Sequence, residues 1–291
     1  MKRVLFLILL LTAALSSSAL DYERFEQGGK VGIRDTQGQV VLPAAFDALG
    51  WSDGSFSLIG QITGYRQGSR WGLINLKKEY VTKADYLTIT SAGGDRVRVS
   101  RELNAVATRY GCLNLSGEVV IPFEYDDITI HDLRAVVMRK EGARYNYGLI
   151  DLNNRTVLPL QYERITPLGT LRYAVRNFEG KTALYADDGK WITGFDIDSL
   201  SSFRHDLAVV YKNLRRGVID RTGTVRAEAV YHDIEISVDG PVRARRPSVW
   251  MIMDLHRKNY TAWRLTRFTR WLPTATGSRC NSRTGWWIPC S

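Results

Sequence analysis

The chain alternates short apolar runs with polar residues in a pattern typical of β-strands. Five segments share a Gly at their second position that is followed by apolar residues, and three other segments end in an apolar run and a Pro. The first set reads VGIRD, WGLIN, YGCLN, YGLID and RGVID, and the second reads QVVLP, EVVIP and RTVLP. A period of two residues with many β-branched and aromatic side chains predicts strands. We therefore expect an all-β fold.

The same segments recur at a nearly regular interval. With the Gly of each WGLIN-like segment as a marker, successive markers are 40, 39, 37, 35, 34 and 34 residues apart. The seven markers are Gly32, Gly72, Gly111, Gly148, Ala183, Gly217 and Met251. A period of this length indicates tandem units that bury their apolar faces against one another. The sequence therefore predicts about seven units over residues 20–262.

A tight turn is expected after each marker. An Asp or Asn stands three residues after most markers and a Gly or Asn six residues after, as in Asp35 with Gly38, Asn114 with Gly117, Asp151 with Asn154, and Asp220 with Gly223. The Asp or Asn side chain accepts hydrogen bonds from the turn's own amides, and Gly or Asn tolerates the left-handed conformation at the fourth position. At Gly117 and Gly223 we therefore expect Asn to be tolerated better than Val. We interpret the acids as structural, because a calcium loop needs several ligands in one segment.

Each unit continues with an aromatic residue followed by an acid, and then with a last strand-like stretch. The aromatic-acid phrase begins at Phe46, Tyr125 and Tyr162, and a similar phrase with His232 in place of the acid begins at Tyr231. The Pro after VVL or VVI is expected at a strand end, since Pro cannot lie in a central strand. An aromatic residue also precedes several markers, at Trp71, Tyr110, Tyr147 and Trp250. We interpret this residue as a wedge packed between units, with stacking on sugars or bases as the alternative.

Units of three or four short strands support two architectures. We expect a stacked β-solenoid, and a closed β-propeller is the alternative because propeller blades typically have four strands in rings of about four to eight. Residues 22–29 are similar to residues 173–180, so the mature chain begins with the last strand of a unit, as ring closure requires. The shrinking marker spacing and the irregular final unit favour the open form.

With these features the chain resembles the WG-repeat family. Units of that family begin near W-G-L-I-D, pass through a D-x-x-G turn and a V-V-I-P strand, and close on Y-D-x-I. The best matches are residues 71–75, 147–151 and 216–220, and the resemblance extends from about residue 20 to about residue 262. It implies an exported or surface-associated bacterial protein that acts as an interaction module, and it supplies no catalytic residue. The fifth and seventh copies depart from the pattern at Ala183 and Met251.

The N-terminal segment predicts export. Lys2 and Arg3 precede an apolar run over residues 4–15 and a small polar stretch that ends at Ala19. This is the arrangement of a secretory signal peptide, here residues 1–19, and roughly 12 apolar residues fall short of the about 20 that span a bilayer. We expect a periplasmic or secreted protein with no transmembrane segment after signal cleavage.

Composition and charge give little evidence for a binding surface. The chain is 44% hydrophobic and 24% charged, which is typical of a globular protein. Residues 248–291 hold seven basic residues and one acid, so they supply +6 of the formal net charge of +10. The basic balance therefore describes the ends of the chain, and export makes nucleic acid an unexpected partner. Residues 263–291 form a basic Trp- and Arg-rich tail, which is a capping unit, a segment for anionic surfaces, or a disordered or out-of-frame stretch.

No motif for catalysis or metal binding is present. The four His residues are scattered, and the chain has no G-x-S-x-G, phosphate-loop or H-E-x-x-H motif. Asp95 and Glu102 break the repeat pattern but have no second feature beside them. Cys112 is expected to be a small buried hydrophobe, whereas Cys280 and Cys290 can pair with one another. We therefore expect no catalytic residues, no metal and no cofactor, and the binding residues stay unassigned.

Three functions fit these observations. The leading hypothesis is an exported non-enzymatic repeat protein that binds a protein or an envelope polymer. The alternatives are a carbohydrate-active envelope enzyme with a site in one irregular repeat, and a purely structural spacer. An enzyme of the first kind would need two carboxyl groups at roughly 5 to 10 Å.

If the turn acids serve the backbone alone, a chelator should leave the stability of the protein unchanged. EDTA should not shift the melting temperature in a circular dichroism scan, whereas Asp220→Ala should lower the free energy of unfolding by about 1 kcal/mol. A melting temperature that falls by several degrees in EDTA would identify the recurring Asp residues as metal ligands.

Overall fold

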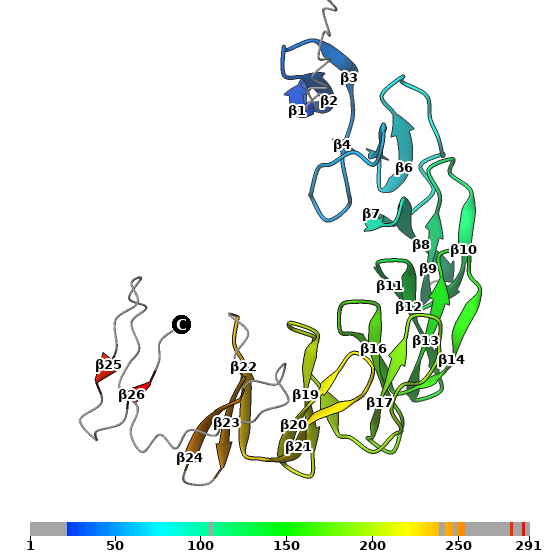
Figure 1. Cartoon of the computed structure of the whole chain (residues 1–291). Coiled ribbons are helices and arrows are strands. Elements are labelled where there is room, and N and C mark those ends of the chain that lie inside the picture. Colours follow the sequence, from blue (N-terminus) through cyan, green and yellow to red (C-terminus); the bar gives the residue numbers. More distant parts are fainter. Residues whose placement is uncertain are drawn as a thin grey trace, which may run out of the picture. The chain divides into compact units, whose positions relative to one another are not determined.

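Figure 1 shows the computed structural model, which describes residues 22–104, 107–238, 242–246, 249–253, 280–281 and 287–288. All regular elements of these residues are β-strands, and none is a helix long and apolar enough to cross a membrane. The chain divides into an N-terminal part that ends at Phe195 and a C-terminal part that begins at Asp196. The predicted signal peptide and most of the predicted tail lie outside the described residues.

The described N-terminal part consists of five antiparallel sheets of three or four strands each. The first sheet contains β1 (Tyr22–Gln27), β2 (Lys30–Asp35) and β3 (Val40–Phe46), and the second contains β4 (Ala48–Leu49), β5 (Ile62–Gln67) and β6 (Arg70–Asn75). The third contains β7 (Thr88–Gly93), β8 (Arg96–Asn104), β9 (Ala107–Leu113) and β10 (Val119–Tyr125). The fourth contains β11 (Asp127–His131), β12 (Arg134–Glu141), β13 (Arg144–Asp151) and β14 (Thr156–Tyr162), and the fifth contains β15 (Arg164–Pro167), β16 (Arg172–Arg176) and β17 (Thr182–Ala186).

Two further sheets and a short ribbon are described in the C-terminal part. The sixth sheet contains β18 (Ser199–Leu200), β19 (Leu207–Lys212), β20 (Arg215–Asp220) and β21 (Val225–Tyr231), and the seventh contains β22 (Asp233–Ile236), β23 (Val242–Arg246) and β24 (Val249–Met253). The ribbon pairs β25 (Cys280–Asn281) with β26 (Trp287–Ile288). The seven markers fall on β2, β6, β9, β13, β17, β20 and β24, one to a sheet. The prediction of an all-β fold of about seven units with three or four strands each is confirmed.

The sequence repeat and the sheet are offset from one another. The chain leaves a sheet after the aromatic residue, and the residue that follows, an acid in the first, third and fourth sheets, lies at the crossing to the next sheet. The N–H of Asp47 donates to the carbonyl of Arg66 in the second sheet (3.1 Å), and the N–H of Asp126 donates to Met138 in the fourth (2.8 Å). The last stretch of one sequence repeat therefore forms the first two strands of the following sheet. In agreement with this offset, β1 pairs with β2.

The D-x-x-G segments form one turn in six copies. The φ angles at its fourth position are 84° at Gly38, 71° at Lys78, 83° at Gly117, 64° at Asn154, 83° at Gly189 and 82° at Gly223. Oδ1 of Asp35 accepts hydrogen bonds from the N–H groups of Gln37 (3.0 Å) and Gln39 (2.8 Å), and Asp151 and Asp220 accept the equivalent pair. The carboxylate thus satisfies turn amides that lack another partner.

The marker Gly allows two strands of one sheet to approach closely. A Cβ atom on Gly32, Gly111 or Gly217 would lie 2.6 to 2.7 Å from a backbone carbonyl oxygen of the neighbouring strand. Each of these strands carries a register irregularity beside the marker, which brings its backbone toward the Gly. Ala183 holds the marker position in the fifth sheet, which has no fourth strand. The close approach of the bulged strand therefore requires Gly at the marker position.

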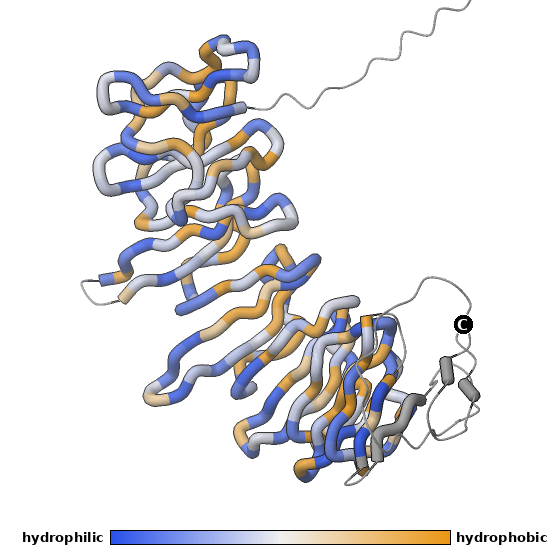
Figure 2. The backbone as a smooth tube through the Cα atoms, turned by 90° about the vertical axis from the view of Figure 1, so that its left-hand side faces the viewer, coloured by the Kyte–Doolittle hydropathy of each residue, from blue (hydrophilic) through white to orange (hydrophobic). Residues whose placement is uncertain are grey.

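The core of the N-terminal part lies between successive sheets. Ile33 and Leu42 of the first sheet pack with Ile74 of the second, and equivalent clusters join the third to the fourth sheet and the fourth to the fifth. Trp71 lies in the cluster between the second and third sheets and is only 9% exposed. Figure 2 shows the matching alternation of apolar and polar residues along the strands. Trp71 is thus placed as the expected wedge between units.

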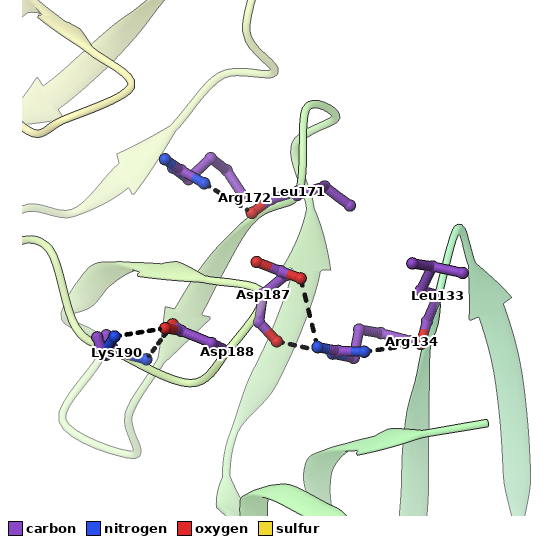
Figure 3. Close-up of polar contacts among 7 residues, drawn as sticks. All are labelled: Leu133, Arg134, Leu171, Arg172, Asp187, Asp188 and Lys190. Atoms are coloured by element: carbon purple, nitrogen blue, oxygen red, sulfur yellow. Dashed lines mark hydrogen bonds and ion pairs between the residues drawn. The ribbon is translucent and has the colours of Figure 1, made fainter. Parts of the chain in front are cut away.

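Polar contacts between turns reinforce this packing on one side of the sheets. Arg134 begins β12 and donates to the carbonyl of Asp187 in the turn of the next sheet (2.7 Å), and its guanidinium also pairs with the Asp187 carboxylate (Figure 3). In the same way Arg96 begins β8 and donates to the carbonyl of Leu152 (3.2 Å). The first hairpin of one sheet is therefore connected to the D-x-x-G turn of the following sheet.

The Pro residues of the repeat require a correction. Pro43, Pro122 and Pro159 were expected at strand ends, but each lies within its strand, at the fourth position of β3, β10 and β14. These strands are the outermost of their sheets, so the Pro nitrogen faces no neighbouring strand. A Pro in an edge strand removes no hydrogen bond from the sheet.

The expectation for Asn at Gly117 also changes with the structure. A Cβ atom at Gly117 would lie 2.8 Å from Cγ2 of Thr82 and 2.9 Å from the carbonyl oxygen of Val81, both in the preceding unit, whereas Gly38 has open space around it. We predict that Gly117→Asn lowers the free energy of unfolding by about 1–3 kcal/mol and that Gly38→Asn lowers it by less than about 1 kcal/mol. Urea denaturation of the two variants measures this difference. Equal losses would show that left-handed strain, and not the neighbouring unit, sets the cost.

Candidate functional site

A regular exposed feature of the described chain is a row of mainly apolar side chains at the eighth residue after each marker. In the N-terminal part these residues, here called the outer row, are Val40, Tyr80, Val119, Thr156 and Trp191, and all are exposed. Tyr80 is 61% and Trp191 is 70% exposed, and in the C-terminal part Val225 holds the same position. Each sheet from the first to the sixth therefore presents one such side chain to solvent.

The same backbone register produces each member of the row. The eighth residue pairs with the second residue after the marker, as Val40 does with Arg34 and Thr156 with Ile150. Tyr80 makes this bridge with Ile74, and Trp191 makes it with Tyr185. A register irregularity follows in the strands that continue, and such a bulge changes which side chains face outward. The outer row therefore lies at the same edge of every sheet.

This edge does not favour pairing with a further strand. β3, β10 and β14 are edge strands, and the Pro in the middle of each removes an N–H that an added strand would need. The second and fifth sheets have no fourth strand among the described residues. The outer row thus offers side chains to a partner, rather than backbone hydrogen bonds.

The second and fifth sheets share an irregular edge that displays the two aromatic members. The hydroxyl of Thr82 accepts the N–H of Leu73, and the hydroxyl of Thr193 accepts the N–H of Leu184, both at 2.9 Å. These side chains replace a strand contact at the same place in both sheets. At the outer-row position of these two sheets, the chain carries an aromatic residue instead of Val or Thr.

Aromatic rings contact Tyr80 and the bridge partner of Trp191, Tyr185. The Tyr80 ring lies 5.0 Å from that of Tyr65 and 6.4 Å from that of Phe46, in edge-on contacts. In the fifth sheet, Tyr185 contacts Tyr162 of the fourth sheet at 6.4 Å. Burial, together with a hydrogen bond to Tyr162, raises the pKa of Tyr185 to about 12, so its hydroxyl stays neutral near neutral pH.

The carboxyl groups with a shifted pKa all have a lowered pKa, which favours the anion. A hydrogen bond from Lys30 lowers the pKa of Asp47, and one from Lys190 lowers that of Asp188 (Figure 3). Burial acts to raise the pKa of Asp220, but hydrogen bonds from Thr222 and Arg226 outweigh it and the net shift is downward. A general acid requires the opposite shift. These carboxylates are suited to ion pairing and turn formation.

Residues 110–130 and 147–168 match the family described as WG containing repeat. The chain contains WG repeats. The two matched segments include the markers Gly111 and Gly148 and the outer-row residues Val119 and Thr156. No curated protein matches the chain.

Solved structures show only distant likeness to these WG repeats. A eukaryotic initiation factor is 13% identical in sequence, and the match covers 84% of this chain and 73% of the initiation factor, with a TM-score of 0.42. The corresponding values are 12%, 84%, 82% and 0.33 for apo AztD from Citrobacter koseri, and 8%, 70%, 79% and 0.28 for the WD40 β-propeller domain of Doa1. Likenesses at this level decide neither architecture nor function.

The residues singled out from the sequence lie in the framework of the WG repeats. Gly72, Gly148 and the other marker glycines lie at close strand contacts, and Asp35, Asp151 and Asp220 hold the turns. Among the described residues, no three His, Cys, Asp or Glu side chains lie close enough to hold a metal. None of the framework residues belongs to the outer row.

The candidates for chemistry are not brought together. Asp95 lies in the turn before β8 with φ 53°, and Glu102 lies seven residues further, about 20 Å along an extended strand, where it pairs with Arg70. Cys112 is fully buried, and burial raises the pKa of its thiol to about 12, so it is no nucleophile in the folded chain. Cys290 and the side chain of Cys280 lie outside the described residues.

The sequence contained one sign of the outer row that was missed. The eighth position after the marker is Val or Thr in four copies but Tyr80 and Trp191 in the second and fifth. Hydrophobic alternation does not distinguish such a residue from a core residue, because it does not reveal the irregular edge at which Tyr80 and Trp191 are exposed.

Proposed function

We propose that this chain is an exported, non-enzymatic interaction module that binds a protein or an envelope polymer along its outer row. The observation that carries the proposal is the exposure of an apolar side chain, or of Thr156, at one equivalent position in every sheet of the N-terminal part. Isolated exposed apolar residues are common on proteins, but a repeated set of them is typical of an interaction site. Export is supported by the sequence of residues 1–19.

The dimensions of stacked sheets suit an extended partner. Sheets that pack face to face lie about 10 Å apart, so the row would present one contact about every 10 Å. Tyr80 and Trp191 supply the largest exposed surfaces, and aromatic side chains are enriched among residues that dominate binding energy. Such a partner would be held through several side chains, with the two rings as its main anchors.

For the architecture, we propose an open β-solenoid over a closed propeller. In the N-terminal part each apolar cluster joins sheets that are consecutive in sequence, and β1 belongs to the first sheet. A solenoid is stabilised by such nearest-neighbour interfaces and needs no contact between its two ends. The irregular last copy is consistent with an end unit.

Small-angle X-ray scattering of the mature chain, residues 20–291, tests this architecture. A compact globule of this length has a radius of gyration of about 19 Å. We expect a clearly larger value and an asymmetric distance distribution, because an open stack is elongated. A value near that of the globule would favour the propeller.

Removal of the two aromatic anchors should abolish most binding. We predict that the double variant Tyr80→Ser, Trp191→Ser folds like the wild type, since both side chains are mainly exposed, but forms far fewer adducts when a photo-crosslinker at Val119 is activated in envelope extract. The matched control is Tyr145→Ser, which removes a half-exposed ring outside the outer row and should leave the adducts unchanged.

Three results would contradict the proposal. Adducts of equal yield in the double variant would place the partner elsewhere, and a wild type with no specific adduct would favour a structural spacer. Hydrolysis of envelope glycan by the purified chain, lost when a carboxylate is replaced, would establish the enzyme instead.

A further inference from the structure

A second exposed feature, apart from the outer row, lies on the third sheet at Arg101. Cζ of this guanidinium lies 4.8 Å from the ring centroid of Tyr86 and 4.8 Å from that of Phe123. The two rings are stacked, with centroids 6.2 Å apart and an angle of 17° between their planes. Arg101 is half-buried, so the rings fix the group while part of it reaches solvent. The guanidinium is therefore held in place before any ligand arrives.

Arg101 differs from its neighbours in having no carboxylate partner among the described residues. Arg98 pairs with Asp127, and Arg109 pairs with Asp126. Burial raises the pKa of Tyr86 against the opposing effects of the Arg101 charge and of a hydrogen bond from Arg101, so the phenol does not act as the counter-ion. Arg101 thus has a hydrogen-bond partner in Tyr86 but no carboxylate partner among the described residues.

The equivalent position in the fourth sheet provides an internal comparison. Arg101 pairs across the strands with Arg109, two residues before its marker, and Arg139 pairs in the same way with Asn146. Arg139 forms an ion pair with Glu124 at 3.2 Å. The third sheet thus places two cations opposite one another, an arrangement that destabilises a sheet, and neutralises only one of them.

An exposed apolar side chain lies beside this cation. Leu103 stands two residues after Arg101 on β8, at a register irregularity between Glu102 and Asn104. Leu103 is 63% exposed. The surface therefore combines one fixed positive charge with one aliphatic contact.

From this arrangement we propose that Arg101 and Leu103 form a docking point for an acidic peptide segment of a protein partner. A Glu or Asp carboxylate of the segment accepts paired N–H groups from the Arg101 guanidinium, and an apolar side chain next to it packs on Leu103. One carboxylate matches the single uncompensated charge, whereas a phosphate monoester carries more than one.

A peptide fits this surface better than a glycan does. The guanidinium of Arg101 covers the rings of Tyr86 and Phe123, so neither ring face is free to stack on a sugar. The aliphatic side chain of Leu103 contributes apolar contact without a ring face. The inference shares with the proposed function only the general role of an interaction module, because its residues are not those of the outer row.

Fluorescence anisotropy with the mature full-length chain tests the docking point. The probe is a labelled eight-residue peptide of alternating Glu and Leu, and the comparison peptide carries Gln in place of Glu. We expect the Glu peptide to bind more tightly, and we expect Arg101→Gln to weaken it about tenfold, since a charge-assisted hydrogen bond is lost. Leu103→Ser should weaken it by a smaller factor, and Arg139→Gln, whose parent side chain is already paired, should leave it unchanged.

Several other results of the same experiment would contradict the docking point. The proposal is overturned if the Gln peptide binds as tightly, if Arg139→Gln weakens binding as much as Arg101→Gln, or if the wild type does not bind the Glu peptide. Tighter binding of oligogalacturonate or tripolyphosphate than of the peptide would assign the site to another class of ligand. Arg101→Lys, which keeps the charge but not the planar fork, should fold and still weaken binding, so loss of folding in Arg101→Gln would not mask the result. Tyr80 and Trp191 stay intact throughout, so the outcome is separate from that of the outer row.

Discussion

The structure depends on one constraint, which is that a sheet of three or four short strands cannot bury both of its faces by itself. Each sheet in the N-terminal part therefore packs its apolar residues against the next sheet in sequence, as Ile33 and Leu42 do with Ile74. Trp71 fills the same role between the second and third sheets. Stability is then a sum of interfaces between neighbours, and this explains why the chain repeats one pattern of residues.

The repeated glycines and acids follow from this packing. The bulged outer strand comes so close to the marker that a Cβ atom at Gly32 or Gly217 would touch its backbone. The turn that connects the two strands must be tight, and the carboxylates of Asp35 and Asp220 stabilise it by accepting amide hydrogen bonds. These residues recur because every unit must solve the same geometric problem, so their recurrence is no evidence of a binding site.

Function is more readily sought where equivalent positions differ. Tyr80 and Trp191 stand where other copies have Val or Thr, and both belong to sheets without a regular fourth strand. Arg101 stands opposite a second Arg, where the equivalent Arg139 stands opposite Asn146 and has a carboxylate partner. A repeat protein supplies its own comparison, since the framework is constant and a departure from it changes one local property at a time.

The sequence by itself determined the strand content, the number of units and the left-handed turns. These features depend on local rules, because alternation with a period of two, the 34- to 40-residue spacing and the D-x-x-G turn are all properties of neighbouring residues in the chain. Tertiary structure decided which apolar residues are exposed and which charges are paired. Val40 and Val119 are exposed beside a bulge between two strands, and Tyr80 and Trp191 are exposed at isolated bridges. Arg101 has no ion pair because no carboxylate of the neighbouring strands and sheets reaches it among the described residues. Both properties depend on register and on contacts between units that are distant in sequence, which local patterns do not encode.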